Sequence, residues 1–264
     1  MIQVFTFKNI EILNCVGDIH GNVKELIYKI VNQYQLKNSI NIVNGDIGFG
    51  FESLQYIIEL FIKLDLKLLQ NNNHIVLYRG NHDDPSYFNG ENNKIFEQFS
   101  NIHVVPDYSI ISINDSFNIL CIGGAISVDR TERLQEMNPN FSRHSFKKFK
   151  TIYWGDENVI YNENKLDEIN NNFVINMVCT HSSPDFCFPY TKDGIKGWLL
   201  KDPYLEEDIR IERETLTKIY NHLIKEQPVL LIWSYGHFHK HNVEYKDNIK
   251  FLACNCMEFN EIRF

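Results

Sequence analysis

The sequence lacks any apolar run long enough to cross a bilayer, since a spanning helix needs about 20 consecutive apolar residues. Its first residues contain no basic stretch leading into an apolar one, which argues against a secretory signal peptide. No segment repeats at a fixed period, and no stretch rich in Pro, Gly or Ser forms a linker. These absences predict one cytoplasmic domain over residues 1–264 with no membrane partner.

The chain also lacks an excess of positive charge, with 26 Lys and Arg against 34 Asp and Glu. Proteins that track a nucleic-acid backbone bind it by neutralising phosphates, so this balance disfavours a long nucleic acid as partner. A nucleotide or a phosphopeptide stays open, because a bound metal ion reverses the local field at a site.

The cysteines are too few and too scattered to form a recognisable framework. Cys121 lies in an apolar run, and such placement is typical of small buried residues in a reducing compartment rather than of disulfides. Cys254 and Cys256 stand too close together for a zinc knuckle. We therefore expect no disulfides and no cysteine-based zinc site. The six cysteines are Cys15, Cys121, Cys179, Cys187, Cys254 and Cys256.

What the first half does contain is a regular alternation of short apolar runs and longer amphipathic ones. The runs predict strands and the amphipathic stretches predict helices. Strand, helix and strand in succession are typical of a parallel sheet with crossover helices. The predicted strands are 12–16, 40–43 and 75–78, and the predicted helices are 23–31 and 54–69.

The second half mixes strands with long irregular stretches. Polar segments at 123–161 and 182–203 predict loops, the first with a short helix, and loops of such length are usually functional. A helix is expected at 206–225. The predicted strands are 109–113, 117–122, 173–179 and 229–233, followed by closing antiparallel strands at 243–245, 249–254 and 257–264.

Five clusters of metal-capable residues follow predicted strands directly. Ligands of an open α/β sheet gather beyond the carboxyl ends of its strands, so all five can meet at one edge. A lone Gly-Asp after a strand is usually a turn, and a lone histidine is often structural. The occurrence of all five together predicts a metal site. Its expected ligands are Asp18, His20, Asp46, Asn81, His181, His237 and His239.

The donor types indicate which metals such a site prefers. Carboxylate oxygen with imidazole nitrogen suits Mn, Fe or Zn better than Ca or Mg. Six or seven ligands exceed what one tetrahedral ion uses, whereas two ions that share a bridging carboxylate, about 3.5–4 Å apart, fit the number. We therefore expect two divalent cations, with Mn as the first candidate and Fe, Zn or Ni as alternatives.

In their order along the chain, the motifs Asp-x-His, Gly-Asp, Gly-Asn-His-Asp, His and Gly-His-x-His resemble the complete motif set of the calcineurin-like metallophosphoesterases. The resemblance spans residues 17–239. It implies an α/β fold, a four-layer α-β-β-α sandwich of two mixed sheets flanked by helices. It also implies ligand roles: Asp18, His20 and His239 for one metal, Asn81, His181 and His237 for the other, with Asp46 bridging.

The chain departs from the protein Ser/Thr phosphatase branch of this family. That branch continues its second motif with an Asp and an Arg, but residues 47–50 here read Ile-Gly-Phe-Gly. The usual phosphate clamp of the branch is therefore missing at this place. The segment 123–133, with Trp154 beyond it, is more similar to a small group found in bacteria and their phages.

The resemblance implies hydrolysis of a phosphate ester by a hydroxide that bridges the two ions. His82 would donate a proton to the leaving oxygen, and Asp83 is a candidate to orient it. Arg130 and Arg133 are candidates to bind phosphoryl oxygens, with two surface arginines as the alternative.

The natural substrate is expected to be a small phosphorylated molecule or a phosphoprotein. The alternatives within enzymes are a phosphodiesterase or nuclease acting on cyclic nucleotides or nucleic acid, and a protein Ser/Thr phosphatase. Outside enzymes, the same fold can serve as a binding scaffold that has lost its metals. The presence of every expected ligand disfavours the scaffold.

Overall fold

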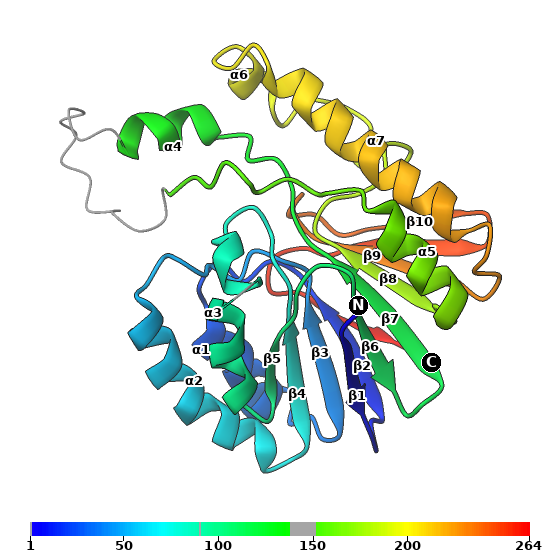
Figure 1. Cartoon of the computed structure of the whole chain (residues 1–264). Coiled ribbons are helices and arrows are strands. Elements are labelled where there is room, and N and C mark those ends of the chain that lie inside the picture. The colour runs from blue at the N-terminus through cyan, green and yellow to red at the C-terminus, as the bar shows by residue number, and fades with distance from the viewer. Residues whose placement is uncertain (1, 90, 138–151) are drawn as a thin grey trace.

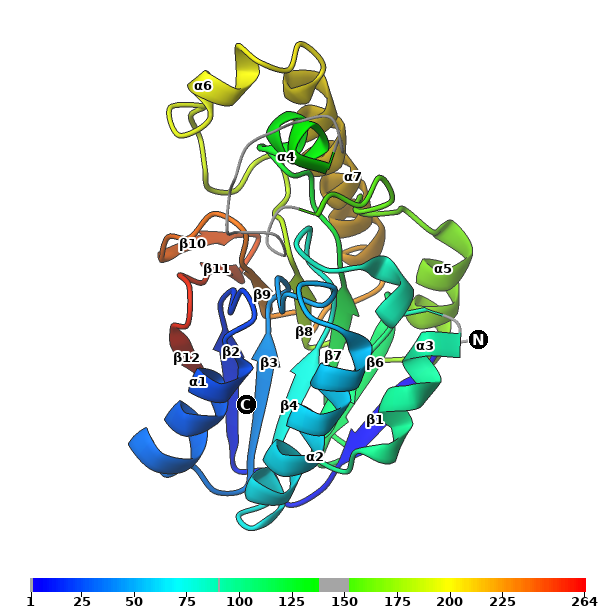
Figure 2. The same cartoon turned by 90° about the vertical axis from the view of Figure 1, so that its left-hand side faces the viewer.

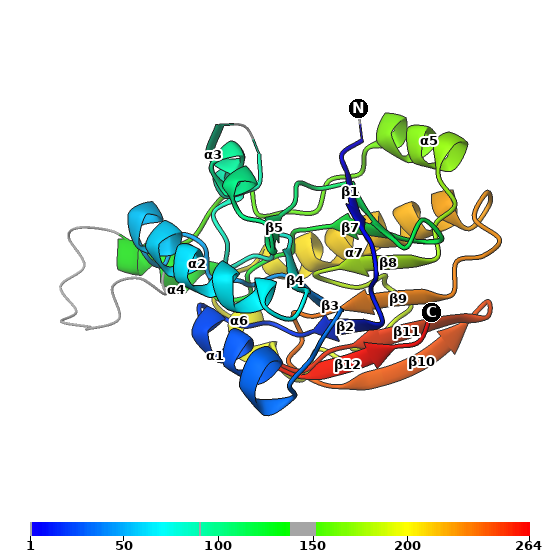
Figure 3. The same cartoon turned by 90° about the horizontal axis from the view of Figure 1, so that it is seen from below.

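Two β-sheets pack face to face, and helices cover the outer face of each (Figures 1 and 3). The computed structural model describes residues 2–89, 91–137 and 152–264. The helices α1 and α2 lie on one outer side, and α5 and α7 lie on the other. The predicted four-layer sandwich of two mixed sheets is confirmed.

The smaller sheet has five strands in the order β12-β2-β3-β4-β5. The strands β2 to β5 run parallel, and β12 pairs with β2 in the antiparallel direction. The bounds are β2 (Ile12–Val16), β3 (Ser39–Val43), β4 (Asn73–Leu77), β5 (Ile102–Val104) and β12 (Phe259–Ile262).

The larger sheet has seven strands in the order β1-β6-β7-β8-β9-β11-β10. The strands β7, β8, β9 and β11 are parallel, whereas the β6–β7 and β10–β11 pairs are antiparallel. The bounds are β1 (Val4–Phe7), β6 (Ser109–Ile113), β7 (Phe117–Ile122), β8 (Met177–Thr180), β9 (Ile232–Tyr235), β10 (Asn242–Lys246) and β11 (Ile249–Ala253).

The helix α2 shows why the covering helices form where they do. Its first turn is capped by Ser53, whose side chain accepts a hydrogen bond from the Tyr56 N–H group. Ile57, Phe61 and Leu64 recur at helical spacing and are buried against the sheet. The helices are α1 (Val23–Tyr28, continued by a π-helical turn at Lys29–Gln33), α2 (Leu54–Leu69), α3 (Glu91–Lys94), α4 (Arg130–Met137), α5 (Glu163–Asn172), α6 (Lys196–Leu199) and α7 (Leu205–Leu223).

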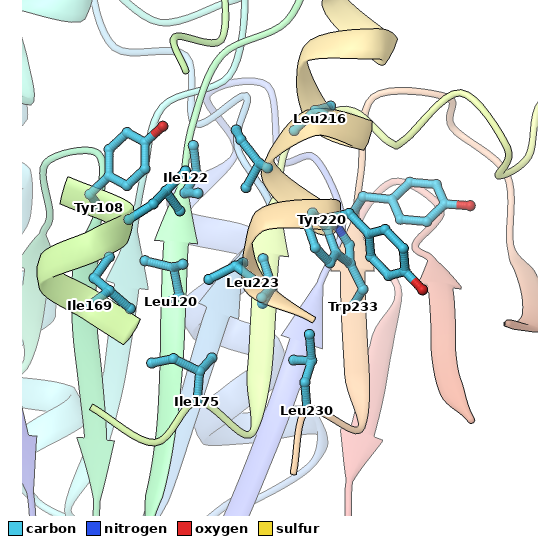
Figure 4. Packing of buried hydrophobic residues seen from close by; sticks show 14 of the residues in the cluster. Tyr108, Leu120, Ile122, Ile169, Ile175, Leu216, Tyr220, Leu223, Leu230 and Trp233 are labelled. Atoms are coloured by element: carbon cyan, nitrogen blue, oxygen red, sulfur yellow. The ribbon is translucent and has the colours of Figure 1, made fainter. Parts of the chain in front are cut away.

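The core divides into three clusters, one for each interface between adjacent layers. In β4, Ile75 and Leu77 belong to the cluster beneath α1 and α2, and Val76 faces the opposite sheet. In β7, Leu120 faces α5 and α7 (Figure 4), while Cys121 lies between the sheets. This alternation follows from the two-residue period of a strand. Because both faces are covered, nearly every residue of the central strands β3 and β7 is buried.

The predicted strands 12–16, 109–113 and 117–122 and the predicted helix 54–69 are confirmed residue for residue. The strands expected at 173–179 and 229–233 were placed too early, because β8 begins only at Met177 and β9 only at Ile232. The last predicted strand, 257–264, is antiparallel as expected, but it pairs with β2 of the smaller sheet as β12.

The irregular stretch predicted at 123–161 contains α4, as the expected short helix; its positions 138–151 lie outside the described residues. Figures 1 and 2 both show α4 and α6 at the end of the molecule where the strands β2, β3 and β4 finish. Among the described residues, no helix has the length and apolar character needed to span a membrane.

Candidate metal centre

The seven predicted ligands come together where the two sheets meet. Asp18, Asp46 and Asn81 follow the carboxyl ends of β2, β3 and β4, and the histidines at 181, 237 and 239 follow β8 and β9. One sheet thus supplies both carboxylates and the amide, and the other supplies three imidazoles. Neighbouring loops at the ends of parallel strands make this convergence possible.

The backbone of these loops is held in conformations that most residues avoid. His20, Asp46, His237 and His239 all have positive φ angles, between 43° and 66°. Such conformations cost of order 1–3 kcal/mol each and cluster at functional sites. Four of the seven predicted ligands have such a backbone conformation. Placing these side chains therefore lowers the stability of the fold.

Two glycines leave the space that the carboxylates occupy. A Cβ atom at Gly80 would lie 2.2 Å from Asp46 Oδ1, and one at Gly236 would lie 2.2 Å from Asp18 Oδ1. Both distances are far below van der Waals contact. A larger residue at either position would therefore displace a carboxylate from the centre.

Asp46 lies at the middle of the group. Its Oδ1 atom is 3.1 Å from His181 Nε2, and its Oδ2 atom is 3.8 Å from His20 Nδ1. Burial acts to raise the pKa of Asp46, but the neighbouring histidines prevail and hold it well below its ordinary value. An ionised carboxylate facing donors on both sides has the placement of a bridging ligand.

One half of the centre, here named the outer subsite, consists of Asp18, His20 and His239 together with Asp46. His239 Nε2 lies 3.1 Å from both Asp18 Oδ2 and His20 Nε2. The side chain of His239 is 50% exposed and that of His20 is 24% exposed. Three donor atoms thus converge on one point that solvent can reach.

The other half, the inner subsite, consists of Asn81, His181 and His237 together with Asp46. Asn81 Oδ1 and His181 Nε2 are 2.9 Å apart, and the rings of His181 and His237 have centroids 5.0 Å apart. His181 is fully buried. Burial lowers the pKa of His237 to about 3 and so keeps it in the neutral form that binds metal.

Cys256 also lies at the outer subsite, and sequence reasoning missed it. Its Sγ atom and the ligand atoms of Asp18, His20 and His239 all lie within 4.8 Å of one another. Burial acts to raise the pKa of the thiol, but hydrogen bonding with the two histidines lowers it to about 7. Spacing along the chain gave no signal, because Cys256 comes from a turn after β11 rather than from one of the motifs.

His82 and Arg133 stand beside the metal ligands. Arg133 Nη2 is 2.6 Å from His82 Nε2 and 2.8 Å from Asp129 Oδ1. Burial lowers the pKa of His82 to about 4, although Asp46 acts to raise it. Since a guanidinium only donates, His82 is a neutral acceptor at Nε2 here. Its Nδ1 atom has no hydrogen-bond partner among the described residues.

The two other predicted residues have structural partners instead. Asp83 does not orient His82; its carboxylate accepts hydrogen bonds from the backbone N–H groups of Gly80 and of residues 47–49. It therefore fixes the loop after β3 against the loop after β4. Arg130 pairs with Asp202 and Asp208 at 2.6 Å, so its guanidinium is held away from the centre.

A pair of residues that sequence reasoning did not consider orients Asn81. Its Nδ2 atom donates to Ser127 Oγ at 2.9 Å, and Ser127 Oγ and Glu157 Oε2 share a hydrogen bond of 2.5 Å. Because the amide nitrogen is engaged there, the amide oxygen faces the inner subsite. Outer partners of this kind commonly fix the orientation of metal ligands.

The chemistry of the donor set fits two divalent cations. Asp18 and Asp46 are fully buried, and within 4 Å the charged groups facing them in the described chain are histidine rings only. Buried carboxylates without a Lys or Arg partner are costly, and a cation in each subsite would supply the missing charge. Both subsites can use Asp46, as a shared ligand requires.

Comparison with known proteins gives a family match and structures of the same fold. The sequence profile of the family described as "Calcineurin-like phosphoesterase" matches residues 13–241. The protein TT1561 of Thermus thermophilus is similar in structure, with a TM-score of 0.51, 10% identity, and coverage of 96% of this chain and 98% of that one. A dimetal phosphatase from Danio rerio gives a TM-score of 0.51 at 11% identity, covering 94% of this chain and 88% of that one. No curated protein sequence is significantly similar.

Proposed function

Because the chain belongs to the calcineurin-like phosphoesterase family, a family of dimetal phosphoesterases, we propose that it hydrolyses a phosphate monoester with one divalent cation in each subsite. The resemblance inferred from the motif set is thereby confirmed at the level of the family. The observation that carries the proposal is the sharing of Asp46 by two sets of donors that face each other across its carboxylate.

When bound, two such cations lower the pKa of a water molecule and polarise the phosphoryl oxygens. The chain contributes the geometry. Asp46 fixes the distance between the subsites, and the buried inner subsite holds its position through Asn81 and His181. Among the described residues, His20, His237 and His239 leave their side of the centre accessible to substrate, whereas Asp18, Asp46, Asn81 and His181 are buried.

Arg133 is placed to bind the phosphoryl group. Only 3% of it is exposed, and its Nε atom has no hydrogen-bond partner among the described residues. A buried donor without a partner costs about 1–3 kcal/mol, and a phosphoryl oxygen would satisfy it. Arginine is suited to this role because its planar fork matches phosphate oxygens.

His82 would then act as the proton donor to the leaving oxygen. Arg133 Nη2 donates to the Nε2 atom of His82 and favours the neutral ring. A substrate phosphate that takes over the guanidinium would uncover Nε2 and place negative charge beside it. Both changes raise the pKa of His82 toward the range that general acid catalysis needs.

A monoester is favoured over a diester by the charge at the site. A monoester phosphate carries up to two negative charges near neutral pH, whereas a diester carries one. The two cations and Arg133 together suit the more highly charged group. The overall net charge of -8 further disfavours a long nucleic acid. A small phosphorylated molecule and a phosphoprotein both remain compatible as substrates.

The test combines metal analysis with hydrolysis of an aryl phosphate monoester and the matching diester. Protein stripped with a chelator and reloaded with Mn, Fe, Zn or Ni should regain two equivalents of metal per chain and hydrolyse the monoester faster. The stripped protein is the control. A fully loaded protein that hydrolyses neither ester would contradict an esterase function, and preference for the diester would contradict the monoester assignment.

A further inference from the structure

Cys256 differs from the other five cysteines in its surroundings. Those five are buried, and the sulfur of Cys254 accepts a hydrogen bond from Asn44 Nδ2 at 3.3 Å. Cys256 is only partly buried, and its Sγ atom lies within 4.8 Å of donor atoms of the outer subsite. The sulfur therefore belongs to a cluster of metal-capable atoms and not to the apolar core.

The turn that carries Cys256 is fastened to the segment that carries Asp18. The Met257 N–H group donates to the Asp18 carbonyl oxygen at 3.1 Å. A Cβ atom at Gly17 would lie 2.0 Å from the Asn255 carbonyl oxygen, so only glycine allows this close approach. The position of the sulfur is thus set by backbone contacts that the fold maintains.

The spacing of the donors matches what one ion requires. The Nε2 atoms of His20 and His239 are 3.1 Å apart, and Asp18 Oδ2 is 3.1 Å from one and 3.9 Å from the other. An ion bound at about 2.0–2.3 Å by N, O and S holds neighbouring donors roughly 3–4 Å apart in four- or five-coordinate geometry. The sulfur lies within 4.8 Å of all three atoms, close enough to serve as a further donor.

We propose that Cys256 is a thiolate ligand of the cation in the outer subsite, together with Asp18, His20, His239 and the shared Asp46. The inference rests on the two-metal function proposed above and adds to it a ligand outside the family's motif set. It makes the two subsites chemically different, because the inner subsite contains only nitrogen and oxygen donors.

The difference in donors predicts a difference in metal preference. Thiolate is a soft ligand that favours Zn and Fe over Mn, whereas carboxylate, amide and imidazole accept all three. The outer subsite should therefore retain Zn or Fe most strongly, while the inner subsite admits Mn. A protein loaded in a mixture of the metals would hold an unlike pair.

Substitution with Co(II) tests the ligand directly, because thiolate bound to Co(II) gives a charge-transfer band in the near ultraviolet that nitrogen and oxygen ligands do not give. The wild-type protein loaded with two equivalents of Co(II) should show this band, and Cys256→Ser should lack it. Cys254→Ser is the matched control, since it alters a cysteine in the same stretch whose sulfur already has a partner, and it should keep the band. In a competition with a chelator, Cys256→Ser should lose affinity for Zn by about 10–100-fold, with a smaller loss for Mn.

A wild-type protein that binds two Co(II) ions without the band would overturn the inference and leave the proposed function standing. A band that survives in Cys256→Ser would also overturn it, because another sulfur would then be responsible. Failure to bind any metal would instead contradict the proposed function.

A measurement on the wild-type protein covers the case in which Cys256→Ser does not fold. Alkylation of Cys256 by iodoacetamide is followed by mass spectrometry of the peptide that contains it, with and without two equivalents of Zn. Zn should slow the reaction at least about tenfold, because a coordinated thiolate is a weaker nucleophile. An unchanged rate in the fully Zn-loaded protein would overturn the inference.

Discussion

The inner and outer subsites share Asp46 but differ in how the fold supports them. In the inner subsite, His181 is fully buried and Asn81 is 2% exposed, and each has a second hydrogen-bond partner behind it. In the outer subsite, the side chain of His239 is 50% exposed. Asn81 and His181 of the inner subsite are therefore part of the packed interior, whereas His20 and His239 of the outer subsite stand at its rim.

The difference in burial assigns one task to each subsite: the inner one holds the geometry of the centre, and the outer one gives access to solvent. A buried subsite keeps its geometry when substrate arrives, and preorganised charge is what lowers the barrier. A rim subsite gives substrate and product a path to solvent. We therefore expect changes in the inner subsite to affect both the fold and the reaction, and changes in the outer subsite to affect mainly metal binding and reaction.

The largest effect is expected where the two halves join. Asp46→Asn removes the shared negative charge, so both subsites should lose metal and monoester hydrolysis should fall by at least about 10³-fold, equivalent to roughly 4 kcal/mol of transition-state stabilisation. Metal analysis and steady-state kinetics measure the two effects. Full occupancy of one subsite in this variant would show that Asp46 is not shared.

The difference in burial between the two subsites is tested by removing one histidine from each subsite. His181→Ala should empty the inner subsite and lower the free energy of unfolding of the metal-free protein by about 1–3 kcal/mol, because His181 Nδ1 lies 2.6 Å from the buried carbonyl oxygen of Asn44. His239→Ala should weaken metal binding at the outer subsite. It should change the free energy of unfolding of the metal-free protein by about 0.5 kcal/mol or less. Urea denaturation with chelator present measures both. Equal destabilisation would contradict the distinction between interior and rim.

His82 lies beside the centre without being a predicted ligand, so its removal should leave both subsites occupied. As a proton donor it is worth about 10²–10⁴-fold. His82→Ala should show that loss on an alkyl phosphate, whose leaving alkoxide is strongly basic, and a smaller loss on a nitrophenyl phosphate. Equal losses on the two esters, or release of metal, would identify His82 as a phosphate-binding group or a ligand.

The two arginines of α4 provide a matched pair. Arg133→Ala should lower kcat/KM for the monoester by about 10–100-fold, because it removes a charged donor from the phosphoryl group. Arg130→Ala breaks the ion pairs with Asp202 and Asp208 and should leave kcat/KM almost unchanged. A loss of similar size in both variants would show that α4 acts through its position and that Arg133 does not contact substrate.

The meeting of the seven predicted ligands could be predicted from the sequence because each follows an apolar strand in a short motif. The carboxyl ends of the strands in a parallel sheet converge whatever the details of packing. The position of each motif directly after a strand was therefore enough to predict that the motifs meet. The hydrogen-bond partners of Asp83 and Arg130 could not be predicted, because a position in the sequence says nothing about which way a side chain turns. Cys256 and Glu157 belong to no motif and reach the centre only through the tertiary fold.

The same limit explains the errors in the fold. The helix α5 buries only Leu166 and Ile169 among its ten residues, so its amphipathic signal was weak and its end at Asn172 looked like a turn. The strand β1 is short, and its first three residues are not fully buried, so periodicity did not reveal it. Its pairing with β6 is set by contacts across more than 100 residues of sequence.

Among the variants that alter the centre itself, the smallest effect on turnover is expected for Glu157→Gln, which tests how Asn81 of the inner subsite is oriented. Burial raises the pKa of Glu157 to about 8, so the carboxyl is neutral at pH 7, and glutamine has nearly the same shape and hydrogen-bonding pattern. The change should cost about 1 kcal/mol or less in the reaction. Glu157→Ala, in contrast, should release Ser127 and let Asn81 turn, with loss of metal from the inner subsite.

The raised pKa of Glu157 also predicts how the stability of Glu157→Gln differs from that of the wild type as pH changes. Below the ordinary pKa of glutamate, 4.5, the carboxyl is protonated in both the folded and the unfolded chain and contributes no difference. Between 4.5 and about 8 the unfolded chain ionises while the folded chain keeps its proton, so this group lowers the free energy of unfolding as pH rises. Glu157→Gln lacks that dependence, so the variant should gain stability relative to the wild type between pH 5 and 8, as urea denaturation of the metal-free proteins measures. A constant difference across this range would mean that Glu157 is ionised in the folded protein, and that Ser127 is held by a charged carboxylate.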